Sequence, residues 1–169
     1  MAKQVTMKGQ PLTLTGQEIE PGDAAPDFEA VNTGLEPVTL ADLKGKVLIL
    51  SAVPSLDTSV CSLETKTFSE KAAELGDDVQ IVTISMDLPF AQQRWCGAEG
   101  VDNVLVLSDY QQASFGENYG VLMRELRLLA RTVFVVDKNG TVRYKHLVEE
   151  VTEEPDYGAV LKAARELTA

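Results

Sequence analysis

Short, nearly uninterrupted apolar runs constrain the fold of this chain more than any other feature of its sequence. The runs are VLILSAV at Val47–Val53, VQIVTISM at 79–86, VLVLS at 104–108 and TVFVVD at 132–137. Runs of this length without apolar–polar alternation are typical of strands that are covered on both faces. Segments with helical spacing separate them, so strands and helices alternate. The sequence predicts an α/β fold with a mixed sheet flanked by helices.

Turn-forming residues add elements at both ends of the chain. The segments VTM and LTLT flank Lys8–Pro11, which predicts an N-terminal β-hairpin. The pair Asn139–Gly140 favours a tight turn that leads into a further strand at 141–148. An amphipathic segment from about Asp156 to Leu167 predicts a last helix. We expect one domain over residues 1–169 with a thioredoxin-like architecture.

Helices are predicted after each of the first three apolar runs. The first follows Pro54, the second begins near Asp87 and ends around Gly97 to Gly100, and the third, with irregular ends, extends through about Leu129. The earlier segment IEPGDAAPDF is rich in Pro, Gly and Asp, which predicts a linker into the main fold.

Composition narrows the classes of function. The 169 residues are 44% hydrophobic, and neither a membrane-length apolar stretch nor a secretory leader is apparent, so we expect a cytoplasmic protein. A formal net charge of -11 argues against nucleic acid and membrane surfaces as partners. The chain has two cysteines and one histidine, too few for a four-ligand Cys/His zinc site.

The segment SAVPSLDTSVC concentrates the chemistry. Polar residues from Ser55 to Ser59 offer N-caps, and Val60, Leu63, Phe68 and Leu75 follow at helical spacing, so Cys61 is expected in a first helical turn. Free N–H groups and the helix dipole favour a thiolate there. Thr58 can bring its hydroxyl beside the sulfur, and Pro54 can wall the pocket against water. Equally, Cys61 can be a small buried hydrophobe and Thr58 only a cap.

The spacing Pro54-x-x-x-Thr58-x-x-Cys61 resembles the peroxidatic motif of the peroxiredoxins. The chain is most similar to the bacterial thiol peroxidases, which are atypical two-cysteine members of that family. The resemblance covers nearly the whole chain and includes SMDLPFAQQRWC, which carries Cys96, and LLARTVFVVDKNG, which carries Arg131.

The resemblance implies a function and a site. Cys61 is expected to be the peroxidatic cysteine and Cys96 the resolving cysteine, with Thr58, Pro54 and Arg131 completing the site. It implies reduction of hydrogen peroxide and organic hydroperoxides through a Cys61 sulfenic acid, an intramolecular disulfide with Cys96, and recycling by thioredoxin. It also implies a homodimer that needs neither a metal nor an organic cofactor.

Several of these residues have a second interpretation. Arg131 precedes a strand and can be a solvated flanking charge. Cys96 can be a partly buried spectator beside Trp95. Met86, Leu88 and Phe90 can form an apolar collar for substrate or ordinary packing. The acids Glu149, Glu150, Glu153 and Glu154 are interpreted as a solvated surface run.

Other functions also use a reactive cysteine. A Cys–His hydrolase would pair Cys61 with His146. A general disulfide oxidoreductase would need a Cys-x-x-Cys pair, but position 64 holds Glu. A redox-sensing module would share Cys61 with a peroxidase and differ only in turnover.

Overall fold

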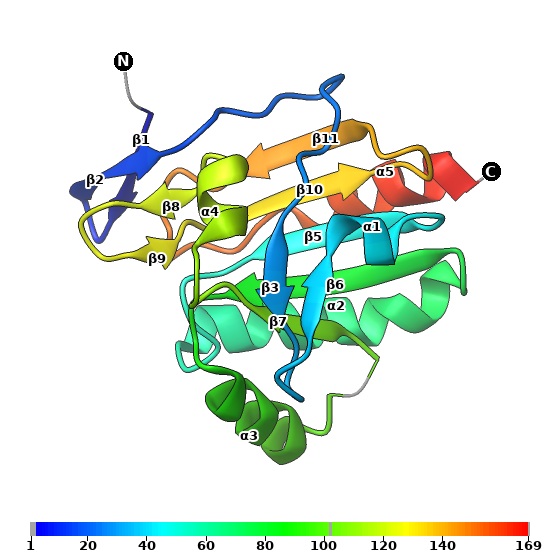
Figure 1. The fold of residues 1–169 in the computed structure, drawn as a ribbon, viewed down its shortest axis with the longest axis horizontal. Helices are drawn as coiled ribbons and strands as arrows, with labels where there is room; N and C mark the ends of the chain where they lie inside the picture. Colours follow the sequence, from blue (N-terminus) through cyan, green and yellow to red (C-terminus); the bar gives the residue numbers. More distant parts are fainter. Residues whose placement is uncertain (1–2, 102, 169) are drawn as a thin grey trace.

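The computed structural model describes residues 3–101 and 103–168, without the side chains of residues 72 and 73. A seven-stranded sheet runs through it in the order β11-β10-β5-β6-β7-β3-β4 (Figure 1). The strands are β3 (Glu29–Val31), β4 (Pro37–Thr39), β5 (Val47–Ala52), β6 (Val79–Ser85), β7 (Leu105–Ser108), β10 (Thr132–Val136) and β11 (Val142–Leu147). Strands β5, β6 and β7 pair in parallel, whereas β10, β11, β3 and β4 pair antiparallel. The predicted mixed sheet is confirmed.

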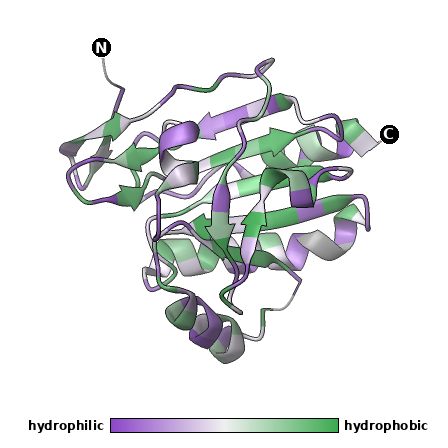
Figure 2. Ribbon diagram, viewed as in Figure 1, coloured by the Kyte–Doolittle hydropathy of each residue, from purple (hydrophilic) through white to green (hydrophobic). Residues whose placement is uncertain are grey.

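Both faces of the central strands are buried, as the continuous apolar runs predict. In β5, Leu48 and Leu50 belong to the core on one face, and Val47 and Ile49 belong to the core on the other. In Figure 2 the central strands of the sheet are mostly apolar, whereas β11 at its edge is more polar. Helices α2 (Ser59–Leu75) and α5 (Tyr157–Thr168) cover one face, while the short α1 (Leu40–Leu43) and α4 (Ser114–Asn118) lie against the other. Helix α3 (Pro89–Glu99) packs beside β7.

The predicted N-terminal hairpin is present and belongs to a second sheet. Its order is β1-β2-β8-β9, with β1 (Gln4–Met7), β2 (Gln10–Thr15), β8 (Leu122–Met123) and β9 (Leu128–Leu129). Val5 and Leu14 from the hairpin pack with Met123 and with Val151, which precedes α5. The hairpin is therefore fastened to the segment that follows β11.

The helix predicted through Leu129 is wrong beyond Asn118. Gly120 ends the helical region with φ +69°, and a Cβ at this position would clash with the carbonyl oxygen of Gln17. The chain then forms the β8–β9 hairpin, and Met123 pairs with Leu14 of β2. Pairing with a strand more than a hundred residues away in sequence overrides the local helical spacing.

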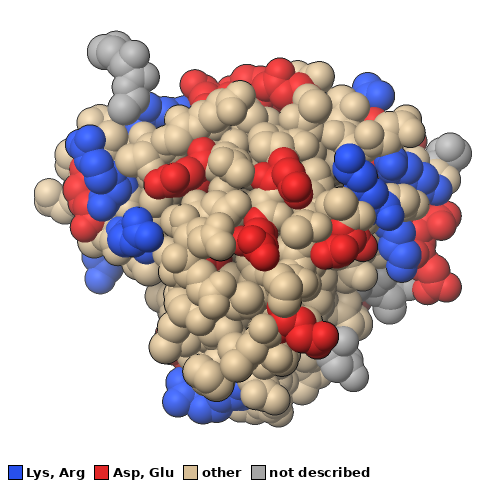
Figure 3. All heavy atoms as spheres, viewed as in Figure 1, with Lys and Arg blue, Asp and Glu red and all other residues tan. Residues whose placement is uncertain are grey.

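The distribution of charged side chains on the surface agrees with the net acidic composition. Acidic side chains spread over the face shown in Figure 3, and the basic side chains gather towards its edges without forming a continuous stripe there. Among the described residues, no helix combines the length and apolarity that crossing a membrane requires.

Candidate active site

A carboxylate just beyond the end of β6 holds the loop between β5 and α2. Pro54, two residues after the end of β5, is buried. Asp87, just beyond β6, accepts hydrogen bonds from the Ser55 hydroxyl at 2.6 Å and from the Leu56 N–H at 2.8 Å. The carboxylate thus fixes the loop that leads into α2. Sequence analysis did not identify this role of Asp87.

Thr58 is the N-cap of α2, and Cys61 lies in the first turn as predicted. The Thr58 hydroxyl accepts a hydrogen bond from the Cys61 N–H at 3.3 Å and donates one to the Ser55 carbonyl at 3.0 Å. The cap sets where the helix begins, and therefore where the cysteine sits. Capping does not exclude a second role for Thr58, because its side chain also lines the cavity described below.

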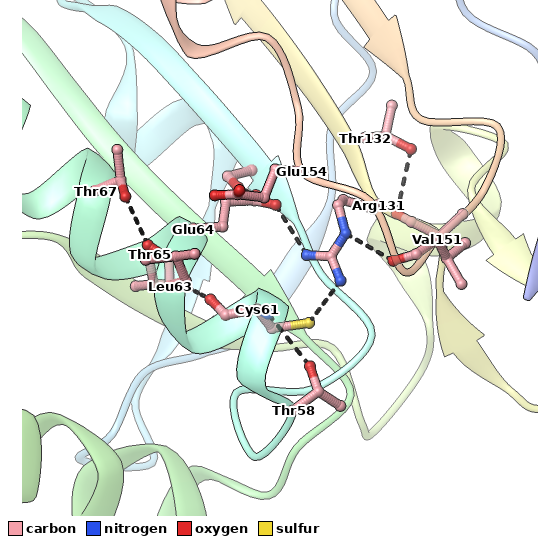
Figure 4. Close-up of polar contacts among 12 residues, drawn as sticks. Thr58, Cys61, Leu63, Glu64, Thr65, Thr67, Arg131, Thr132, Val151 and Glu154 are labelled. Atoms are coloured by element: carbon pink, nitrogen blue, oxygen red, sulfur yellow. Dashed lines mark hydrogen bonds and ion pairs between the residues drawn. The ribbon is translucent and has the colours of Figure 1, made fainter. Parts of the chain in front are cut away.

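Arg131 lies against the sulfur of Cys61 (Figure 4). Its Nη2 donates to Cys61 Sγ at 3.1 Å, its Nη1 to Glu64 at 2.9 Å and its Nε to the Val151 carbonyl at 2.8 Å. The arginine is 2% exposed and the cysteine 0%, so the interpretation of Arg131 as a solvated flanking charge is wrong. Burial disfavours the charged guanidinium, but the Cys61 sulfur and the Glu64 carboxylate outweigh burial and raise the pKa of Arg131.

Glu64 is a second site residue that the sequence interpretation missed. It is fully buried, and its second oxygen accepts a hydrogen bond from the Ser51 hydroxyl at 2.5 Å. Burial raises the pKa of Glu64, against the opposing effects of Arg131 and Ser51. Position 64 was used only to exclude a Cys-x-x-Cys pair. A usable signal was its spacing, because a residue three positions after Cys61 lies on the same face of a helix.

A cavity of about 450 Å³ opens beside this cluster. It is lined by Met7, Lys8, Pro54, Thr58, Ser59, Val60, Arg131, Val151 and Thr152. The structure thus brings Pro54, Thr58 and Arg131 together next to the buried Cys61. The residues suggested as an apolar collar lie elsewhere: Met86 packs against the core of the opposite sheet face, and Leu88 and Phe90 are exposed.

Cys96 lies on α3 and faces a different hollow from Arg131. It is partly buried against the same core as Cys61, and it lines a groove with Asn32, Glu36 and Gln93. Both cysteines are free thiols. Burial raises the pKa of the Cys96 thiol, which favours its protonated form at neutral pH. Its assignment as the resolving cysteine stays a prediction.

His146 is not positioned to activate Cys61. It lies on β11 opposite Val133 and lines a hollow with Lys3, Glu20 and Lys145, whereas the hydrogen-bond partner of the Cys61 sulfur is Arg131. The geometry therefore disfavours the Cys–His hydrolase. Among residues 3–101 and 103–168, no three His, Cys, Asp or Glu side chains gather where they could hold a metal ion.

Comparison with known proteins places this chain in a family. The family model described as Redoxin matches residues 20–161. The thiol peroxidase of Bacillus subtilis (strain 168) is 55% identical over 164 residues, covering 97% of this chain and 98% of that protein. The thiol peroxidase of Staphylococcus aureus (strain MRSA252) is 51% identical, with coverage of 97% and 99%.

Solved structures agree with this placement. A crystal structure of a peroxiredoxin-like protein from Aquifex aeolicus superposes with a TM-score of 0.92 at 44% identity, covering 99% of this chain and 98% of that one. A thiol peroxidase from Chromobacterium violaceum, at 20% identity and a TM-score of 0.86, supports the fold alone. With Cys61 and Arg131 in contact inside a thioredoxin-like fold, the chain belongs to the Redoxin family and, within it, to the thiol peroxidases, which are peroxidases of the peroxiredoxin type.

Proposed function

We propose that this thiol peroxidase reduces hydrogen peroxide and organic hydroperoxides with Cys61 as the attacking thiolate. The observation that carries the proposal is the 3.1 Å contact between Arg131 Nη2 and Cys61 Sγ in a fully buried setting. A neighbouring guanidinium and a helix N-terminus both stabilise a thiolate, which is the nucleophilic form of cysteine.

The first step is a displacement at oxygen. The Cys61 thiolate attacks one peroxide oxygen, the O–O bond breaks, and the other oxygen leaves with the electron pair as hydroxide or alkoxide and takes up a proton. Cys61 becomes a sulfenic acid while the hydroperoxide becomes water or an alcohol. Arg131 is placed to stabilise the negative charge that moves from sulfur to the leaving oxygen.

Glu64 and Thr58 support this step in different ways. Glu64 and the Val151 carbonyl hold two nitrogens of Arg131, so the third nitrogen stays directed at the sulfur. A group held in place before the reaction needs little reorganisation as charge moves. The Thr58 hydroxyl lines the cavity and is suited to orient the peroxide by hydrogen bonding.

Cys96 then resolves the oxidised cysteine. Its sulfur attacks the Cys61 sulfenic sulfur, water leaves, and an intramolecular disulfide forms. A dithiol protein, which we propose is thioredoxin, exchanges with this disulfide and restores both thiols as it becomes oxidised itself. Since Cys96 faces a separate hollow, resolution needs a local rearrangement around α2 or α3.

The family resemblance supports a dimer, and the length and composition of the chain support a single domain. We propose that residues 1–169 form one domain, that two copies form a homodimer, and that the enzyme works in the reducing cytoplasm, where thioredoxin is kept reduced. Sedimentation of the reduced protein tests the dimer, and a monomer at micromolar concentration contradicts it.

The decisive assay follows peroxide consumption with thioredoxin, its reductase and a nicotinamide readout. We expect turnover with hydrogen peroxide and with an alkyl hydroperoxide. Cys61→Ser should be folded and inactive, because a hydroxyl is far less acidic and less nucleophilic than a thiol. Cys96→Ser should consume one equivalent of peroxide and then stop. Slow, substoichiometric consumption by the native protein would favour a redox sensor, and turnover by Cys61→Ser would end the proposal.

A further inference from the structure

Glu150 does not behave as part of a solvated acidic run. Its Oε1 accepts hydrogen bonds from the Thr6 hydroxyl and the Gly9 N–H, both at 3.0 Å. Its Oε2 accepts from the Lys8 N–H at 3.2 Å and from the N–H and hydroxyl of Thr152 at 3.0 and 2.6 Å. One carboxylate thus joins the turn of the N-terminal hairpin to the segment that follows β11.

The backbone around Glu150 reinforces this connection. The Thr6 N–H donates to the Glu149 carbonyl at 2.7 Å, and the Val151 N–H donates to the Thr6 carbonyl at 2.8 Å. Lys8 and Gly9 have φ values of +51° and +81°, and both of their N–H groups reach the Glu150 carboxylate. A left-handed lysine is unfavourable by itself, so these bonds compensate for a strained turn.

The two joined segments form part of the wall of the cavity beside Arg131. Met7 and Lys8 line it from the hairpin, and Val151 and Thr152 line it from the segment after β11. Met7 is partly buried against the apolar cluster that contains Val151. The shape of this side of the cavity therefore depends on how the hairpin turn is held.

We propose that Glu150 is a positioning residue that sets the fit of organic hydroperoxides by holding Met7 against Val151. The inference rests on the proposed function. Hydrogen peroxide has no organic group to contact this wall, so its reduction is not expected to depend on the wall. The backbone bonds that join Thr6 to Glu149 and Val151 do not use the Glu150 side chain. Without the carboxylate, Glu64 and the Val151 carbonyl therefore keep their bonds to Arg131, and the chemistry at the sulfur persists.

The low pKa of Glu150 keeps its carboxylate ionised, as its five hydrogen bonds require. Hydrogen bonds lower the pKa of Glu150 to about 2, and the bond from the Thr152 side chain contributes most to this shift. The bond from the Gly9 backbone N–H contributes next. The carboxylate therefore remains an anion, and an acceptor for all five bonds, across the whole neutral range.

Two substitutions with a matched control test the proposal. Glu150→Ala removes every bond, Glu150→Gln keeps one carbonyl oxygen, and Glu153→Gln neutralises an exposed acid three residues away. In the thioredoxin-coupled assay we expect Glu150→Ala to raise KM for cumene hydroperoxide by about tenfold without a change in kcat. The rate with hydrogen peroxide should stay within about twofold of the native rate. Glu150→Gln should be intermediate and Glu153→Gln unchanged.

The outcomes separate this inference from the proposed function. An equal loss with both peroxides would assign Glu150 a merely structural role and overturn the proposal. A native protein that reduces neither peroxide would overturn the proposed function itself. If Glu150→Ala fails to fold, Met7→Ala provides the test, because it removes the held side chain and leaves the carboxylate bonds in place. It should reproduce the rise in KM for cumene hydroperoxide, and an unchanged KM would refute the inference.

Discussion

Neutralising Glu64 tests whether Cys61 is a thiolate in the folded protein. Arg131 lies between two acceptors, Glu64 at 2.9 Å and the Cys61 sulfur at 3.1 Å. In Glu64→Gln, a thiolate at position 61 still provides a counter-charge for the buried guanidinium. If position 61 carries a neutral hydroxyl instead, as in Cys61→Ser, the same substitution leaves Arg131 without one. The cost of Glu64→Gln should therefore depend on the residue at position 61.

The magnitudes follow from burial. Breaking a buried ion pair so that one charge is left unpaired costs about 3 to 5 kcal/mol, and Arg131 and Glu64 are 2% and 0% exposed. We expect a cost of this size for Glu64→Gln in the Cys61→Ser background. With the cysteine present, only one charge-assisted hydrogen bond is weakened, which costs about 1.5 kcal/mol. The two substitutions should thus be non-additive by about 2 kcal/mol.

The assay is a double-mutant cycle measured by urea denaturation at pH 7 under reducing conditions. Its members are the native protein, Glu64→Gln, Cys61→Ser and the double variant, compared at constant m-value. Glu70→Gln, on an exposed position of the same helix, is the control and should be neutral in both backgrounds. Additive free energies of unfolding would show that Cys61 does not share the charge of Arg131, and would refute the thiolate assignment.

Three further predictions concern Arg131, Thr58 and Asp109, a buried carboxylate that directly follows β7. Arg131→Ala should slow oxidation of Cys61 by peroxide by roughly 30- to 1,000-fold, about 2 to 4 kcal/mol, in stopped-flow experiments; an unchanged rate would leave the arginine a structural role only. Thr58→Ala should lower the free energy of unfolding by about 1 kcal/mol through loss of the α2 cap, whereas Thr58→Ser, which can still cap, should not; equal effects would contradict the capping argument. Burial, opposed by the Gly116 and Phe115 N–H groups, raises the pKa of Asp109 from 3.8 to about 6. The folded chain therefore holds a proton that the unfolded chain releases in this window, so stability should decline from pH 3.8 to 6, and Asp109→Asn should flatten the decline in pH-dependent denaturation.

Elements whose structure is set locally were predictable from the sequence. The apolar run that became β5 and the Lys8–Gly9 turn carry their own signals, and the structure contains both. Residues 122–129 carry a helical spacing but form the β8–β9 hairpin, because β8 pairs with β2. Gly120 was the available warning, since a glycine at a crowded left-handed position ends a helix. Strands β3 and β4 span three residues each and were missed, as such short strands give little periodicity.

In the candidate site, too, the residues set by local sequence were predictable, whereas those set by distant partners were not. Thr58 and Cys61 belong to one short segment, and the capped first turn of α2 was predicted from it. Glu64, Asp87 and Glu150 were missed because acidic residues are usually solvated, so composition alone assigns them to the surface. Each has its carboxylate satisfied by partners far along the chain, such as Arg131 for Glu64 and Lys8 for Glu150. Such partners become apparent only once the strands are paired.

The contacts between α2 and α3 bear on the proposed disulfide between Cys61 and Cys96. The Trp95 indole N–H donates to the Ser62 hydroxyl at 3.2 Å, so the neighbours of the two cysteines are linked in the reduced form. Cys96 nevertheless faces the groove beside Asn32, while Cys61 lies under the cavity of Arg131. A disulfide requires Cα atoms about 4.4 to 6.8 Å apart with converging Cβ vectors. Because the Cys61 sulfur accepts a hydrogen bond from Arg131, we expect the proposed bridge to form only after this contact has broken. Oxidation of the proposed thiolate would remove its negative charge and weaken that contact, so we expect the first proposed step to favour the opening that the second one needs.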